Sequence, residues 1–173
     1  MTVLSVENHM RRAKSLIKKG RVNDAKILYE QLLKKFPKNQ KAQKALANLS
    51  RNQEEIQFLT ESERYNQLLI SLHVEGRFEE MLVMSKKVIQ EYPNLILGWN
   101  YYGAAQRALG NLEAALTAFK RVIEINPTFS DGHTNLGAVF QDRNDFAIAI
   151  ECYKTAICLK HDNAKAFNNL GTA

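Results

Sequence analysis

Histidine and cysteine are the residue types of this chain best suited to catalysis or metal binding. They occur without a shared spacing, at His9, His73, His133, His161, Cys152 and Cys158. On one helix, the separation of six positions between Cys152 and Cys158 spans roughly 9 Å, which is more than a disulfide can bridge. Two thiols without further ligands do not make a zinc site. We therefore expect neither a metal nor a cofactor.

Motifs for other catalytic chemistry are also missing from the sequence. No glycine-rich phosphate loop and no nucleophile elbow occurs in it. Gly103, Gly110 and Gly137 are accounted for by helix packing and turns. His133 stands at a packing position, which favours a partly buried core histidine over a ligand. The sequence predicts a protein that is not an enzyme.

Composition limits the class of protein further. The chain has 173 residues, 45% of them apolar, with 24 Lys and Arg against 18 Asp and Glu. This mixture excludes a mainly disordered chain, and no apolar run reaches the roughly 18 residues of a membrane span. Residues 1–12 do not have the pattern of a secretory signal, so the expected location is cytoplasmic.

Positive charge is concentrated at the start of the chain. Residues 1–50 contain 12 Lys and Arg but only 3 Asp and Glu. Arg11, Lys14 and Lys18 would share one face of a helix, and a solvated face is the favoured interpretation. An anionic partner such as a membrane or nucleic acid is the weaker alternative, because no aromatic residue among them offers a stacking platform.

The dominant feature of the sequence is a period of 34 residues. It separates Gly76, Gly110 and Asn144, and it separates Gly103, Gly137 and Gly171. A fixed period of this size is typical of a solenoid of repeated units. In residues 96–129 the pattern predicts helices over Ile96–Leu109 and Leu112–Ile125, with Gly110 in the left-handed conformation that ends the first helix.

These residues resemble the tetratricopeptide repeat, a helix–turn–helix unit of the same length. The residues that carry the resemblance in 96–129 are Trp99, Tyr102, Gly103, Gly110, Ala115, Phe119 and Pro127. The resemblance implies an all-α fold, an α–α superhelix of antiparallel helix pairs. It divides residues 1–173, taken as a single solenoid, into repeats at 6–39, 62–95, 96–129 and 130–163, and the first helix of an incomplete repeat at 164–173.

Residues 40–61 interrupt this register and are interpreted as a shortened repeat or an insertion. We expect a helix over Gln40–Ser50 and a short second helix capped by Asn52, with Ile56 and Leu59 facing inward. Thr60 and Glu63 have the spacing of a capping box that would begin the next helix.

The last helix of the sequence presents an apolar face where a solenoid needs a polar cap. We therefore expect the natural chain to continue beyond Ala173, or the open end to pack against another copy in self-association.

The resemblance implies that partners bind in a concave groove lined by the first helix of each repeat. The side chains expected to face it are Asn66, Gln67, Asn100, Tyr101, Arg107, Thr134, Asn135, Gln141, Asn168 and Asn169. Amides both donate and accept hydrogen bonds, so a row of them suits an extended peptide backbone. The row is similar to the asparagine ladder of protein O-glycosyltransferase arms, whereas the basic residues of a chaperone-binding carboxylate clamp are largely missing.

Two functions follow from this groove. The first is a scaffold that binds a peptide or protein partner. The alternative is a substrate-docking arm at the N-terminus of a larger enzyme, because the order of repeats is similar to arms that precede bacterial sulfotransferase or glycosyltransferase domains. The identity of the partner is not encoded in the pattern.

Overall fold

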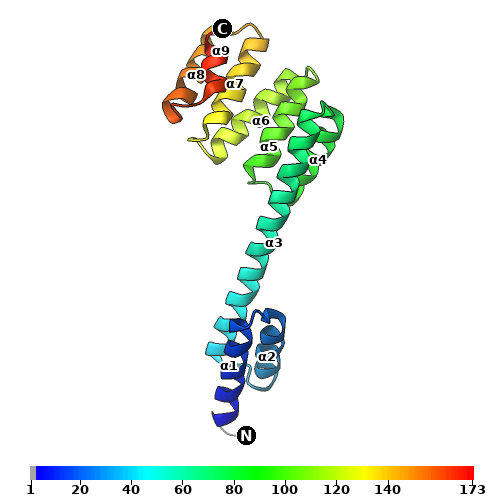
Figure 1. Ribbon diagram of the computed structural model, residues 1–173, viewed down its shortest axis with the longest axis vertical. Helices are drawn as coiled ribbons and strands as arrows, with labels where there is room; N and C mark the ends of the chain where they lie inside the picture. The colour runs from blue at the N-terminus through cyan, green and yellow to red at the C-terminus, as the bar shows by residue number, and fades with distance from the viewer. Residues whose placement is uncertain (1–2) are drawn as a thin grey trace. The chain divides into compact units, whose positions relative to one another are not determined.

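The computed structural model describes residues 3–173, with side chains from Val6 onward, and it contains only helices in this part of the chain (Figure 1). Their bounds are α1 Val3–Lys18, α2 Val22–Lys35, α3 Gln40–Val74, α4 Phe78–Glu91, α5 Ile96–Ala108, α6 Leu112–Ile125, α7 Ser130–Asp142, α8 Phe146–Leu159 and α9 Ala164–Leu170. The all-α prediction is confirmed, and α5 and α6 match the helices expected in residues 96–129.

Contacts divide the chain into two compact units, Met1–Glu63 and Arg64–Ala173. The first unit packs α1 and α2 with the beginning of α3 around a core that includes Ala13, Tyr29 and Leu49. The second unit packs the end of α3 with α4–α9, and its core is built around Leu69 and Met81 near one end and Phe119 and Val139 further along. Each unit therefore has its own hydrophobic core.

The turns within helix pairs depend on residues in the left-handed conformation. Gly20, Gly76, Gly110 and Asn144 have φ angles of 74°, 71°, 81° and 63°, respectively. At the turn after α5 the Asn111 amide donates to the Gln106 carbonyl over 2.8 Å, and the Gly110 amide donates to the Arg107 carbonyl over 3.0 Å. These bonds satisfy the last carbonyls of the helix, as in a Schellman motif. The predicted role of Gly110 is confirmed.

Helix α3 corrects the expectation for residues 40–61. The structure has one continuous helix from Gln40 to Val74, so Asn52 does not begin a second helix. The Thr60 hydroxyl donates to the Ile56 carbonyl over 2.9 Å, a bond made inside a helix and not at an N-cap. Ile56 and Leu59 are 64% and 57% exposed and do not face inward. The segment lacks Gly and Pro, so nothing in it breaks the helix.

None of the helices in the described residues combines the length and the apolar character needed to cross a bilayer.

Candidate functional site

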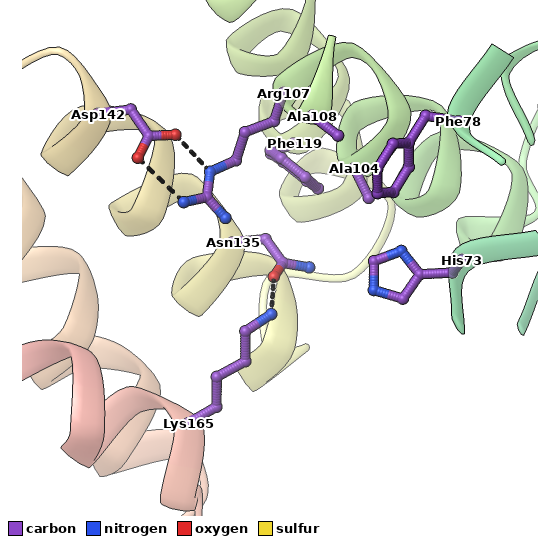
Figure 2. Close-up of a pocket in the computed structure, with 9 residues that line it drawn as sticks. All are labelled: His73, Phe78, Ala104, Arg107, Ala108, Phe119, Asn135, Asp142 and Lys165. Atoms are coloured by element: carbon purple, nitrogen blue, oxygen red, sulfur yellow. Dashed lines mark hydrogen bonds and ion pairs between the residues drawn. The ribbon is translucent and has the colours of Figure 1, made fainter. Parts of the chain in front are cut away.

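The second unit contains a cleft of about 340 Å³ between helices that are far apart in the sequence (Figure 2). Helices α3, α5, α7 and α9, which are the first helices of the expected repeats, contribute most of its lining. The lining residues are His73, Phe78, Ala104, Arg107, Ala108, Phe119, Asn135, Asp142 and Lys165. A cleft of this volume can enclose a few side chains of a peptide.

Asn135 connects three helices through its side-chain amide. Its Nδ2 donates to Asn100 Oδ1 over 2.9 Å, and its Oδ1 accepts a hydrogen bond from Lys165 Nζ over 2.8 Å. Asn100 lies on α5, Asn135 on α7 and Lys165 on α9, so the bonds cross from helix to helix. This arrangement holds the Lys165 ammonium group at the cleft, where Figure 2 shows it beside the Asn135 oxygen.

The electrostatic surroundings of Lys165 disfavour its charge. Desolvation lowers its pKa from the ordinary value, and the positive charge of Arg107 lowers it further, while the Asp131 carboxylate opposes both effects. A cation in this situation is stabilised when an anionic group binds beside it. Lys165 is therefore the group of the cleft whose charged form a ligand carboxylate would stabilise most.

Arg107, in contrast, already has a partner. Its Nε and one terminal nitrogen lie 2.6 Å and 3.0 Å from the two carboxylate oxygens of Asp142. This bidentate pair joins α5 to α7 at one end of the cleft and balances the guanidinium charge. The pair shapes the cleft, and Lys165 supplies a second positive charge.

Aromatic rings form the opposite end of the cleft. The His73 ring contacts Phe78 and Tyr101 edge to face, with centroids 6.1 Å and 6.3 Å apart. Burial raises the pKa of Tyr101 above its ordinary value of 10.0. This end is suited to an apolar side chain of a ligand, and the Lys165 end to a polar or acidic one.

Thr134 does not face the cleft, and the expectation that it would is wrong. It is fully buried, and its hydroxyl donates to the Ser130 carbonyl over 3.1 Å and accepts from Asn163 Nδ2 over 3.0 Å. Asn163 also donates to the Ser130 hydroxyl over 2.7 Å and caps α9 by accepting from the Ala166 amide. Thr134 thus belongs to a buried polar network between α7 and α9.

The other predicted groove residues divide into two groups. Asn100, Tyr101, Arg107 and Asn135 lie in or directly beside the cleft, as described above. Gln141 accepts from the Tyr153 hydroxyl over 2.7 Å and donates to Thr172 over 3.3 Å, so its amide is engaged outside the cleft. The remaining four are partly or fully exposed and do not line the cleft: Asn66, Gln67, Asn168 and Asn169.

Four lining residues with functional side chains were not predicted from the sequence: His73, Phe78, Asp142 and Lys165. The repeat period contained a signal for two of them. His73 is 34 residues before Arg107, and Asp142 is 34 residues after Ala108, so each shares a repeat position with another lining residue. Lys165 and Phe78 stand one period from Asp131 and Leu112, which do not line the cleft, so helix packing that the period alone does not specify brings them there.

Family models for this kind of repeat match both units. One described as a TPR repeat matches residues 103–143 and 139–173, and one described as a tetratricopeptide repeat matches residues 7–39. Among curated proteins, the type IV pilus assembly protein PilF of Pseudomonas aeruginosa is 36% identical over 62 residues. That stretch is 36% of this chain and 25% of PilF, so the chain spans about a quarter of the length of this relative.

Solved structures show the same fold. A thermophilic TPR protein of Thermus thermophilus superposes with a TM-score of 0.59 at 21% identity, covering 96% of this chain and 81% of that one. The first TPR of Spaghetti (RPAP3), bound to the HSP90 peptide SRMEEVD, superposes with a TM-score of 0.58 at 16% identity, covering 62% and 86%. The chain therefore contains tetratricopeptide repeats and has the all-α superhelical fold of tetratricopeptide-repeat proteins.

Proposed function

We propose that this chain is a protein-interaction scaffold, and that the cleft of its second unit holds a peptide segment of a partner protein. The observation that carries the proposal is the hydrogen-bonded row from Asn100 through Asn135 to Lys165, which ends in a partly desolvated ammonium group. Such a row offers a fixed polar edge and one charge to an extended ligand.

The chemistry of the cleft supports binding in preference to catalysis. Arg107 is paired with Asp142, and Lys165 is hydrogen-bonded to a neutral amide. No lining residue is a nucleophile placed beside a base. The fold is shared with RPAP3, whose structure with an HSP90 peptide is a case of peptide binding by such repeats.

A site-specific photo-crosslinker tests the proposal and does not require the partner to be identified first. It is placed at Ala108, an exposed residue that lines the cleft, and at Lys120 as a matched control, because Lys120 is exposed on α6 outside the cleft. We expect the Ala108 position to capture one recurrent peptide segment in cells, and the Lys120 position not to capture it. Equal capture at both positions would contradict binding in the cleft.

Once the captured segment has been synthesised as a peptide, its affinity can be measured to test the contribution of the Lys165 charge. Lys165→Met should weaken binding about tenfold, since a hydrogen bond to a charged group contributes about 1.5 kcal/mol. Lys120→Met removes the same charge from α6 and should leave the affinity within about twofold. The substrate-docking role in a larger enzyme stays a prediction, and the identity of the captured segment decides it.

A further inference from the structure

The first unit contains a separate cleft of about 550 Å³ between α1 and the beginning of α3. Five of its lining residues lie on α1, Asn39 immediately precedes α3, and Lys41 lies in its first turn. The residues that line it are Val6, Glu7, Met10, Arg11, Lys14, Asn39 and Lys41. The site described above lies entirely in the second unit, so this cleft is distinct from it.

The charge of this cleft is strongly positive. Arg11 and Lys14 are one turn apart on α1, Lys41 comes from α3, and Glu7 is the one carboxylate among the lining residues. No ion pair among the described side chains involves any of these three cations, whereas Arg21 nearby is paired with Asp24. Three such cations from two helices create a positive potential that favours an anionic ligand.

The cleft also has an apolar part. Val6 and Met10 are half-buried and pack against the core of the first unit. Methionine adapts its shape to irregular apolar partners. An aromatic ring, which would stack on a nucleic-acid base, is not among the lining residues. Cations around an apolar floor suit an acidic polypeptide that carries an apolar side chain.

We propose that this cleft binds an acidic segment of a partner protein, with carboxylates beside Arg11, Lys14 and Lys41 and an apolar side chain against Val6 and Met10. This goes beyond the function proposed above, because it assigns a second and electrostatically different binding site to the other unit. A partner with two suitable segments would then be held at both sites.

The test uses the whole chain and a fluorescein-labelled probe peptide, EEDLEED, followed by fluorescence anisotropy. The cleft variant combines Arg11→Gln, Lys14→Gln and Lys41→Gln. The matched variant combines Lys19→Gln, Lys34→Gln and Lys35→Gln, which removes the same charge from positions of the same unit outside the cleft. Helical content, measured by circular dichroism, shows that both variants are folded.

The cleft variant should bind the probe about tenfold more weakly, since three exposed ion pairs are lost, and the matched variant should bind it within about twofold. The amide probe QQNLQQN should bind at least tenfold more weakly to the unaltered chain, and EEDSEED about threefold more weakly. The amide probe requires no protein variant, so it remains informative if a variant unfolds.

Three results would overturn the proposal. Equal weakening in both variants would mean diffuse attraction to net charge. Tighter binding of a single-stranded oligonucleotide or of phosphatidylserine vesicles, with the same dependence on Arg11, Lys14 and Lys41, would mean a different class of partner. Loss of binding in Lys165→Met but not in the cleft variant would place the probe in the second unit, which would support the function proposed above and reject this site.

Discussion

Gly137 is pressed against a tyrosine ring that cannot move aside. A β-carbon at this position would lie 2.7 Å from Tyr153 Cε1 and 3.0 Å from Cys152 Cβ. Tyr153 is fully buried, and its hydroxyl donates to Gln141 over 2.7 Å. The close approach of α7 and α8 therefore requires glycine here.

Gly137→Ala should lower the free energy of unfolding of the second unit by about 1–2 kcal/mol. Overpacking costs about 1–3 kcal/mol, and the better helix propensity of alanine offsets up to about 1 kcal/mol of it. Urea unfolding measures the change. Gly171→Ala is the control, because the nearest atoms to its β-carbon are 3.6 Å away, and it should change stability by less than about 0.5 kcal/mol. Equal effects of the two substitutions would contradict the packing argument.

The lowered pKa of Lys165 predicts how stability depends on pH. The folded state disfavours the charged form of Lys165, so charging this side chain lowers the free energy of unfolding. This loss of stability is fully present below the lowered pKa of the folded state, and it disappears as the pH rises to the ordinary pKa of 10.5 in the unfolded state. Wild type should therefore gain stability relative to Lys165→Met as the pH rises toward 10.5. Urea unfolding of both proteins measures the difference, in which other titrating groups cancel. A difference that stays constant with pH would show that the pKa is not lowered.

The roles of single residues were predicted well where the local backbone determines them. They were predicted poorly where they depend on a side chain far away in the sequence. Gly110 is specified by its own conformation, and His133 is half-buried, as its packing position predicted. The hydrogen bond of His133 with the Pro127 carbonyl at 2.9 Å, which matches that of Trp99 to Pro93 at 2.8 Å one repeat earlier, was not predicted. The burial of Thr134, however, depends on Asn163 in the following turn. The sequence around Thr134 does not predict that Asn163 is its partner.

At the scale of elements, α3 shows the limit of local signals. Thr60 and Glu63 have the spacing of a capping box, yet that spacing also fits the interior of a helix. The helix continues because most residues from Arg51 to Glu63 are good helix formers and none of them is Gly or Pro. Pro93 and Pro127 stand in connections between helices, so the bounds of α5 and α6 could be predicted.

The exposed middle of α3 gives a direct test of this correction. Ile56→Glu combined with Leu59→Lys should change the free energy of unfolding by less than about 0.5 kcal/mol, because both side chains are mostly exposed. Thermal unfolding followed by circular dichroism measures it. If the two residues faced a core, as a separate inward-facing helix would require, the loss would exceed about 2 kcal/mol. Ala115→Lys, at a fully buried position, serves as the destabilising control.

For the whole molecule, the division into two units with separate cores predicts two unfolding transitions. Trp99 is the single tryptophan of the chain and lies in the second unit, so its fluorescence reports on that unit alone. Circular dichroism at 222 nm reports on all the helices. In urea we expect the two signals to give different midpoints, since contacts in repeat proteins are mainly between neighbours. Superimposable curves would show that the continuous α3 couples the units into one cooperative transition.

The side-chain hydrogen bonds that hold the helix pairs together also determine whether one repeat can replace another. Asn135 bonds to Asn100 and Asp142 bonds to Arg107 across repeats, and Asn163, which caps the next helix, bonds to Ser130 within residues 130–163. A duplicate of residues 96–129 grafted in place of 130–163 would put Tyr101, Ala108 and Phe129 where these three residues stand. The graft would keep the helices and turns but lose every one of these bonds. Each repeat is therefore matched to its neighbours, and shuffling copies of one consensus unit would rebuild the scaffold without its cleft.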